Sequence, residues 1–221
     1  MEFSDRTALV TGSSRNIGRA IATQLAERGA DVGVCARTDR EGCVETAERV
    51  EAAGGSAAVA LGDLADPDDV ESMVETVRSE LGSSDVLVNN ATYRPQSSFL
   101  DVSQDELDRV LDVNFRGLFL TTQHVLPDML DNGGGSVVNL IGQMVYLGTF
   151  DHVHSFGSKL GIEGMVRQLA TEFGPDGIRV NGLSPGLIDV GREPTDECAR
   201  VEREVIDATP LDRLGRVDEV A

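Results

Sequence analysis

The stretch Ala8–Ala20 constrains the fold of this chain more than any other. It opens with three apolar residues, continues through a turn rich in Gly, Ser and Asn, and ends in a helix start whose apolar residues recur at helical spacing. Glycine lets the backbone approach an anion closely, and the free N–H groups and positive dipole end of a helix N-terminus attract negative charge. A buried strand, a tight turn and a helix in this order predict a loop that binds the phosphates of a dinucleotide.

The same turn resembles that of a known family. Thr11, Gly12 and Gly18 match the Thr-Gly-x-x-x-Gly-x-Gly motif of the short-chain dehydrogenases/reductases, and Asn16 stands where the family usually has its middle glycine. Asn tolerates a positive φ better than other non-glycine residues, so we expect the turn to keep its shape. The resemblance covers essentially all 221 residues and implies an oxidoreductase that uses a nicotinamide cofactor.

Apolar segments alternate with helical patterns along the whole chain. This alternation predicts right-handed crossovers and an α/β fold, a doubly wound Rossmann-type parallel sheet with helices on both faces. A length of 221 residues fits one such domain, residues 1–221. The six predicted strands are Ala8–Val10, Asp31–Ala36, Ser56–Leu61, Asp85–Val88, Ser136–Ile141 and Ile178–Leu183. The main predicted helices are Asn16–Arg28, Asp39–Ala53, one capped by Asp66 that reaches about Leu81, one capped by Ser103 that reaches about Leu130, and Val153–Phe173.

Composition excludes several classes of protein. The sequence has no run of about 18 apolar residues that would span a membrane, and its N-terminus lacks the apolar core of a signal peptide. The three cysteines, Cys35, Cys43 and Cys198, are too few and too scattered for a disulfide framework or a zinc site, so we expect a reduced, cytoplasmic protein. His152 and His154 suggest a metal pair but lack a third ligand, so no metal site is predicted.

The charge balance is strongly acidic. The formal net charge is −19, and the basic residues are 18 arginines and a single lysine, Lys159. Nucleic acid is a poor partner for such a surface, because binding relies on cations that neutralise phosphates. An acidic, lysine-poor surface suits a high-salt cytoplasm, where screening weakens self-repulsion. We therefore hypothesise a halophilic source.

The resemblance implies which residues bind the cofactor. Arg37 directly follows the second predicted strand, where an acidic residue would bind the ribose 2′-OH of NAD and an arginine accommodates the 2′-phosphate of NADP. Arg37, with Arg15, therefore favours NADP, with NAD still possible; the alternative is a solvated surface arginine. Asp63 matches the family's contact to adenine, or it forms a turn. The predicted cofactor-binding set is Gly12, Ser14, Arg15, Ile17, Gly18, Arg37, Asp63, Leu64, Asn90, Lys159, Pro185, Gly186 and Ile188.

The catalytic positions match the family only in part. The resemblance assigns Lys159 to the lysine that lowers the pKa of a catalytic tyrosine and binds the nicotinamide ribose, and Asn114 to the asparagine that holds a water of the proton relay. The tyrosine position, four residues before the lysine, is Ser155, and the position of the substrate-binding serine is Gly142. A serine hydroxyl is a far weaker acid than a phenol, so both substitutions remove groups that carbonyl reduction uses.

Three interpretations remain open. In the first, a neighbour replaces the tyrosine: Tyr146 follows the fifth strand and His154 adjoins Ser155. In the second, the substrate is a conjugated thioester, because dienoyl-CoA reductases of the family also carry Ser ahead of the Lys, with a Tyr and an Asn nearby. In the third, the chain binds NADP(H) without turnover. We expect an NADP(H)-dependent oxidoreductase acting on a small carbonyl, alcohol or acyl thioester.

Two expectations concern the C-terminal part. The segment Gly191–Ile206 is polar and acidic, which is typical of a mobile substrate lid or of an exposed linker helix. Leu211–Ala221 resembles the family's penultimate segment, and the resemblance implies a further helix and seventh strand that this sequence lacks. We therefore expect the sixth strand at an exposed sheet edge. The resemblance also implies a homo-oligomer, a dimer or tetramer, to which the helix Val153–Phe173 contributes.

Overall fold

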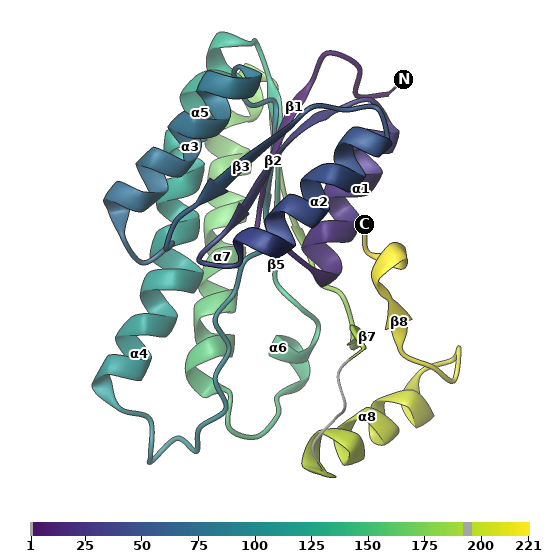
Figure 1. Cartoon of the computed structure of the whole chain (residues 1–221). Helices are drawn as coiled ribbons and strands as arrows, with labels where there is room; N and C mark the ends of the chain where they lie inside the picture. Colours follow the sequence, from purple (N-terminus) through teal and green to yellow (C-terminus); the bar gives the residue numbers. More distant parts are fainter. Residues whose placement is uncertain (1, 192–195) are drawn as a thin grey trace.

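The computed structural model describes residues 2–191 and 196–221, and it describes side chains for residues 2–191 and 202–221. Its centre is a six-stranded parallel sheet in the order β3-β2-β1-β4-β5-β6, with helices on both faces (Figure 1). The strands are β1 Thr7–Thr11, β2 Asp31–Ala36, β3 Ala57–Leu61, β4 Val86–Asn89, β5 Gly135–Leu140 and β6 Ile178–Leu183. The predicted doubly wound α/β fold and its six strands are therefore confirmed.

The central strand β1 has neighbours on both sides and is buried on both faces. Ala8, Leu9 and Val10 are fully buried. Because successive side chains of a strand point to opposite faces, Leu9 packs with α3 and α5, whereas Ala8 and Val10 pack with α1 and α2. The helices are α1 Asn16–Glu27, α2 Arg40–Ala52, α3 Pro67–Leu81, α4 Gln104–Leu111, α5 Leu118–Asp131, α6 Met144–Leu147, α7 Val153–Phe173 and α8 Asp196–Ala208.

The helix expected from Ser103 to about Leu130 is interrupted in its middle. Ser103 caps α4 as predicted, but residues Asp112–Gly117 form a π-helical turn before α5 begins. Gly117 packs so tightly there that a Cβ atom would lie 2.4 Å from the carbonyl oxygen of Leu64. Asn114 lies within this turn, which is the kind of local irregularity that a buried Asn beside Gly predicts.

Three short elements were not predicted. They are α6 and the two strands of a small separate sheet, β7 Ile188–Asp189 and β8 Gly215–Arg216. Each is too short to show a hydrophobic period in the sequence. In the segment expected to be a lid or linker helix, α8 begins at Asp196, whereas residues 192–195 and the side chain of Cys198 lie outside the described residues.

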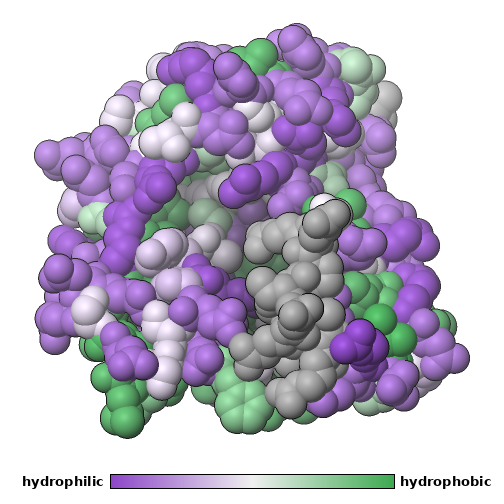
Figure 2. Space-filling model, turned by 60° about the horizontal axis from the view of Figure 1, so that its bottom comes forward, coloured by the Kyte–Doolittle hydropathy of each residue, from purple (hydrophilic) through white to green (hydrophobic). Residues whose placement is uncertain are grey.

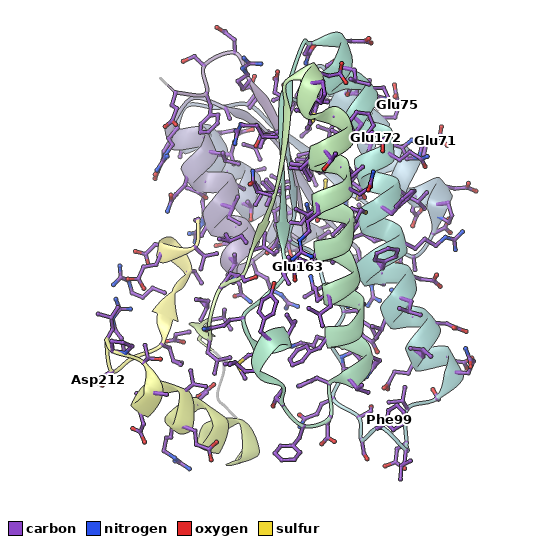
Figure 3. All side chains as sticks on the ribbon, turned by 180° about the vertical axis from the view of Figure 1, so that it is seen from behind. Glu71, Glu75, Phe99, Glu163, Glu172 and Asp212 are labelled. Carbon is purple, nitrogen blue, oxygen red and sulfur yellow. The ribbon has the colours of Figure 1, made fainter. Side chains whose placement is uncertain are left out.

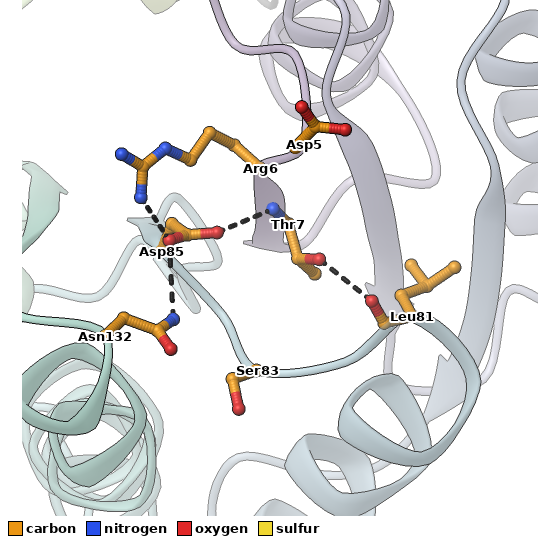
Figure 4. Close-up of a pocket in the computed structure, with 7 residues that line it drawn as sticks. All are labelled: Asp5, Arg6, Thr7, Leu81, Ser83, Asp85 and Asn132. Carbon is orange, nitrogen blue, oxygen red and sulfur yellow. Dashed lines mark hydrogen bonds and ion pairs between the residues drawn. The ribbon is translucent and has the colours of Figure 1, made fainter.

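The amino ends of β1 and β4 are fixed together by a buried carboxylate. Asp85 accepts hydrogen bonds from the backbone N–H of Thr7, from Arg6 and from Asn132, and the Thr7 hydroxyl donates to the carbonyl of Leu81 (Figure 4). These bonds join four chain segments around a shallow hollow on the side of the sheet away from the strands' carboxyl ends. We assign them a structural role.

Strand β6 lies at the edge of the six-stranded sheet, as expected. Its last three residues, 181–183, are exposed. No helix in the described part of the chain is long and apolar enough to cross a membrane.

Candidate functional site

A large pocket lies at the carboxyl ends of the parallel strands. Its volume is about 1310 Å³, more than the roughly 300–1,000 Å³ of a typical small-ligand site, so it has room for a dinucleotide and a second molecule. The turn after β1, the loops after β2, β3, β4 and β5, and one face of α7 line it. Figure 2 brings this end of the molecule forward and shows a mostly hydrophilic surface, hollowed near its middle.

The glycine-rich turn forms one wall of the pocket and has the predicted shape. Gly12 has φ +66° and Asn16 has φ +50°, so Asn16 adopts the left-handed conformation that its position requires. A Cβ atom on Gly18 would lie 2.3 Å from the carbonyl oxygen of Gly12, so only glycine fits there. The side chain of Asn90 donates to the carbonyls of Thr11 and Gly12 and holds the turn against β4.

The N-terminus of α1 opens into this wall without a capping side chain. Asp39, Asp66 and Ser103 cap α2, α3 and α4, whereas among the described residues no side chain caps α1 and its first turn holds no acid. Ser14 and Ile17 line the pocket beside it. Free N–H groups at a helix N-terminus bind anions, and the sequence here leaves them available.

Two exposed arginines, Arg15 and Arg37, stand at the rim beside the turn. Asp39 lies close by, where a hydrogen bond from Ser14, a bond from the backbone N–H of Gly42 and the charge of Arg15 lower its pKa. The rim that carries Arg15 and Arg37 therefore also includes the carboxylate of Asp39, which accepts hydrogen bonds from protein groups.

Asp63 has partners of its own and also lines the pocket, next to Leu64. It accepts from Arg109 at 2.8 Å and from the backbone N–H of Ala65 at 3.0 Å. Burial raises the pKa of Asp63, but the bonds from Arg109 and Ala65 outweigh burial and lower it overall. Asp63 is hydrogen-bonded within a turn and also lines the pocket, and its contact to adenine stays a prediction.

The loop after β6 closes the opposite side of the pocket. Pro185, Gly186 and Ile188 all line it, as the predicted set requires. The carbonyl of Pro185 accepts from the backbone N–H of Gln143 at 2.7 Å, so this loop is tied to the loop after β5. A Cβ on Gly186 would lie 3.2 Å from the side-chain oxygen of Gln143, which favours glycine there.

One face of α7 carries the candidate catalytic residues. His152, Ser155, Phe156 and Lys159 all line the pocket, at the i, i+3, i+4, i+7 spacing of a single helix face. The ammonium group of Lys159 is buried and donates to the carbonyl of Leu140 at 2.7 Å. Burial, and then the charge of Arg94, lower the pKa of Lys159 to about 8.

The two substituted positions both face the pocket. Ser155 is 1% exposed, and its hydroxyl has no hydrogen-bond partner among the described residues. Gly142 has φ +106°, a conformation that disfavours any other residue, and no described atom lies within 4 Å of where its Cβ would be. The pocket therefore has open space where a serine side chain would stand.

Asn114 supports the site but does not line the pocket. Its side-chain oxygen accepts from the backbone N–H of Tyr93 and from Thr92, and its amide donates to the carbonyl of Tyr93 and the hydroxyl of Ser158. These bonds join the loop after β4 to α7. The role of Asn114 in holding a water of a proton relay stays a prediction.

Two expected replacements for the tyrosine lie away from the pocket. Tyr146 is half exposed on α6, and its hydroxyl donates to Glu163, which Figure 3 labels on α7. His154 is buried, with Nε2 3.2 Å from a carboxylate oxygen of Glu106 on α4, although without hydrogen-bond geometry. Neither side chain lines the pocket, so neither is placed to donate a proton to a molecule bound there.

Sequence reasoning missed His152 as a site residue. The sequence suggested His152 only as a metal ligand paired with His154, yet His152 lines the pocket and His154 does not. Helical phase could have separated them, because at about 100° per residue position 152 lies within about 20° of Lys159 around the axis, whereas position 154 lies about 140° away.

The comparisons with known proteins agree with the fold. The model of a family described as enoyl-(acyl carrier protein) reductase matches residues 12–221. A 3-oxoacyl-[acyl-carrier-protein] reductase of Staphylococcus aureus is 34% identical over 98% of this chain and 87% of its own length. An L-rhamnose 1-dehydrogenase (NAD(P)(+)) of Azotobacter vinelandii is 34% identical over 100% of this chain and 88% of its own.

A solved structure has a closely similar fold. A Sinorhizobium meliloti protein assigned to the short-chain alcohol dehydrogenases matches with a TM-score of 0.93 and 35% identity, over 99% of this chain and 87% of its own. Sequence, fold and pocket together show that this chain belongs to the short-chain dehydrogenase/reductase family, a family of oxidoreductases.

Proposed function

We propose that the chain is an NADP(H)-dependent oxidoreductase that transfers a hydride to or from a small carbonyl, alcohol or acyl-thioester substrate. The observation that carries the proposal is the pocket, which joins an uncapped helix N-terminus and two rim arginines at one end to a buried Lys159 at the other. A reduced nicotinamide dinucleotide supplies the hydride when bound. This chain's own residues bind and orient it.

The pocket fits such a cofactor in three places. Gly12 and Gly18 let the turn pack closely against Asn90 and Ala91, and the uncapped N-terminus of α1 beside this turn offers backbone N–H groups to a diphosphate. Arg15 and Arg37 stand where they can bind a 2′-phosphate, the group that separates NADP from NAD. Lys159 offers a buried ammonium group to a ribose, beside the loop that contains Gly186.

Cofactor preference gives the first test. Replacing Arg37 with Asp removes the positive charge and adds a repulsive one, so NADPH affinity falls by at least the value of one charged hydrogen bond, about 1.5–3 kcal/mol, or about 10- to 150-fold. NADH affinity changes little, because NADH lacks the 2′-phosphate. Fluorescence titration with NADPH and with NADH in molar KCl measures the two affinities and gives their ratio. Arg40→Asp, a substitution of an exposed arginine outside the pocket lining, serves as the control. An unchanged NADPH-to-NADH ratio in Arg37→Asp contradicts the proposal.

A second candidate substrate class is a conjugated enoyl thioester. Two observations favour it: the matching family model is described as an enoyl reductase, and Ser155 replaces the tyrosine that protonates a carbonyl oxygen. Incubating the protein with NADPH and either a 3-oxoacyl or a 2-enoyl thioester, and identifying the product by mass spectrometry, separates the two. A protein that binds NADPH but reduces neither is the non-catalytic binder.

We also propose a homo-oligomer built on α5 and α7. Phe119 on α5 and Val153 and Leu160 on α7 are large apolar residues that are 45%, 51% and 44% exposed. Exposed apolar side chains on neighbouring helices are typical of a subunit interface. Light scattering after gel filtration should give at least twice the mass of one chain, and Leu160→Asp should lower it.

A further inference from the structure

The pocket contains one side chain that can release a proton near neutral pH and that the family resemblance does not account for. His152 stands at the start of α7, one helical turn before Ser155 on the same face. The two residues expected to replace the tyrosine, Tyr146 and His154, do not line the pocket. Ser155 itself cannot act as the acid, because an aliphatic hydroxyl is far less acidic than a phenol.

The ring of His152 is held by contacts on two sides. Its Nδ1 lies 3.1 Å from the carbonyl oxygen of Pro95, and its ring packs on Phe156 with the centroids 5.4 Å apart. The backbone adds a second link between the same loops, because the N–H of Ser97 donates to the carbonyl of Asp151 at 2.9 Å. The orientation of the ring is therefore set by the loop after β4 and by the first turn of α7.

This orientation selects the nitrogen that exchanges protons. A backbone carbonyl can only accept, so the contact with Pro95 places a hydrogen on Nδ1 in the neutral ring. Nε2 is then the nitrogen that gains and loses a proton. Since His152 is only half-buried and lines the pocket, its ring can reach a substrate bound there.

The charges around His152 come from both elements that contact it. Burial lowers its pKa, the bond to Pro95 raises it, Arg94 and His154 lower it, and Asp151 raises it. The net effect is a pKa below the ordinary 6.5. A histidine of this kind is a stronger acid than a free imidazole and loses its proton readily once it has gained one.

We propose that His152 delivers the proton to the substrate oxygen, in place of a tyrosine at position 155, in the reaction proposed above. During carbonyl reduction a bound reduced nicotinamide would supply the hydride of the new C–H bond; the carbonyl oxygen takes the proton from Nε2 to form the O–H bond, and the N–H bond of the imidazolium breaks. The neutral ring regains its proton from water through the open pocket. Alcohol oxidation runs the same steps in reverse.

Substitution of His152 by Gln tests this role. Gln keeps a donor for the carbonyl of Pro95 but cannot release a proton, so NADPH affinity and the melting temperature stay at their wild-type values. The rate of carbonyl reduction, kcat, falls by about 100-fold or more, since general acid catalysis contributes about 10²–10⁴. His124→Gln on α5 is the matched control, because His124 does not line the pocket, and it keeps the wild-type rate.

Two further measurements test the role of His152 without relying on how far kcat falls. The wild-type kcat for reduction decreases as pH rises through the pKa of His152, because only the imidazolium can donate, and His152→Gln loses this decrease. The chain has only three histidines, so NMR can follow each ring. The resonance that disappears in His152→Gln should titrate below pH 6.5 and shift when a substrate ketone is added to the NADP⁺ complex.

Three other results would overturn either the role of His152 or the proposed function itself. A wild-type protein that reduces a carbonyl while His152→Gln keeps its rate and pH profile overturns the role of His152 and leaves the proposed function standing. Loss of NADPH affinity in His152→Gln alone also overturns it, because His152 would then act in cofactor binding or folding. A wild-type protein that binds NADPH but reduces nothing overturns the proposed function and, with it, this inference.

Discussion

Replacing Lys159 with Met is expected to stabilise the protein while removing its activity. Lys159 is 7% exposed, and burial, with the charge of Arg94, lowers its pKa from 10.5 to about 8. At about 1.36 kcal/mol per pKa unit, this difference corresponds to a cost of about 3 kcal/mol for keeping the charge in the folded protein. Met has a similar length and carries no charge.

The substitution also removes a hydrogen bond, which cancels part of the gain in unfolding free energy. The carbonyl of Leu140 accepts a hydrogen bond from Lys159 and would lose its donor, which costs about 1–2 kcal/mol. The expected net effect near pH 7 is therefore an increase in unfolding free energy of about 1–2 kcal/mol. Under the proposed function, a buried lysine is kept for activity at the expense of stability.

The pH dependence distinguishes this explanation from a simple packing effect. Below pH 8 the lysine is protonated in both the folded and the unfolded protein, so the full cost is present. Between pH 8 and 10.5 the unfolded chain binds more protons than the folded one, so wild-type stability rises with pH relative to Lys159→Met. Urea unfolding of both proteins from pH 6 to 10, at constant high salt, measures the difference. A less stable Lys159→Met at pH 7, or a difference that does not change with pH, would refute the reasoning.

Three further outcomes are expected. The net charge is −19 and exposed acids such as Glu71 and Glu172 contribute to it (Figure 3); salt screens repulsion within such a surface, so the melting temperature should rise by several degrees in molar KCl, and an equal melt without salt would count against a halophilic source. Gly18→Ala should weaken NADPH binding at least 10-fold by titration, because its Cβ would meet the carbonyl of Gly12, and unchanged affinity would contradict the assigned turn. Ser155→Tyr should increase carbonyl reduction, measured as NADPH consumption, and no change would show that the missing phenol does not limit the reaction.

Local signals were enough to predict the wall of the pocket that the glycine-rich turn forms. The glycine turn, its Asn16 at positive φ and the order of the strands follow from short-range residue patterns, and parallel strands bring their carboxyl ends to one edge of the sheet. Asn90 could be placed beside the turn for the same reason. Its two bonds to the carbonyls of Thr11 and Gly12 then give that placement a structural purpose.

The α7 side of the pocket depends in large part on details that sequence patterns do not resolve. Only the two nearby histidines can be separated from sequence, because position 152 lies close to Lys159 around the axis of α7 and position 154 does not. The direction of Tyr146 depends on α6, a helix of four residues with no recognisable period. The contacts of Asn114 depend on a π-helical turn that ends at Gly117, which packs closely against Leu64 in a tertiary contact.

Transfer of deuterium from a labelled cofactor tests the central claim most directly. The protein is incubated in molar KCl with NADPH that carries deuterium at C4 of the nicotinamide, together with ketones, 3-oxoacyl thioesters and 2-enoyl thioesters. The proposed function predicts that mass spectrometry finds one deuterium bound to carbon in at least one reduced product, and none with Lys159→Ala. Tight NADPH binding with no deuterium in any product would contradict the claim that this pocket performs hydride transfer.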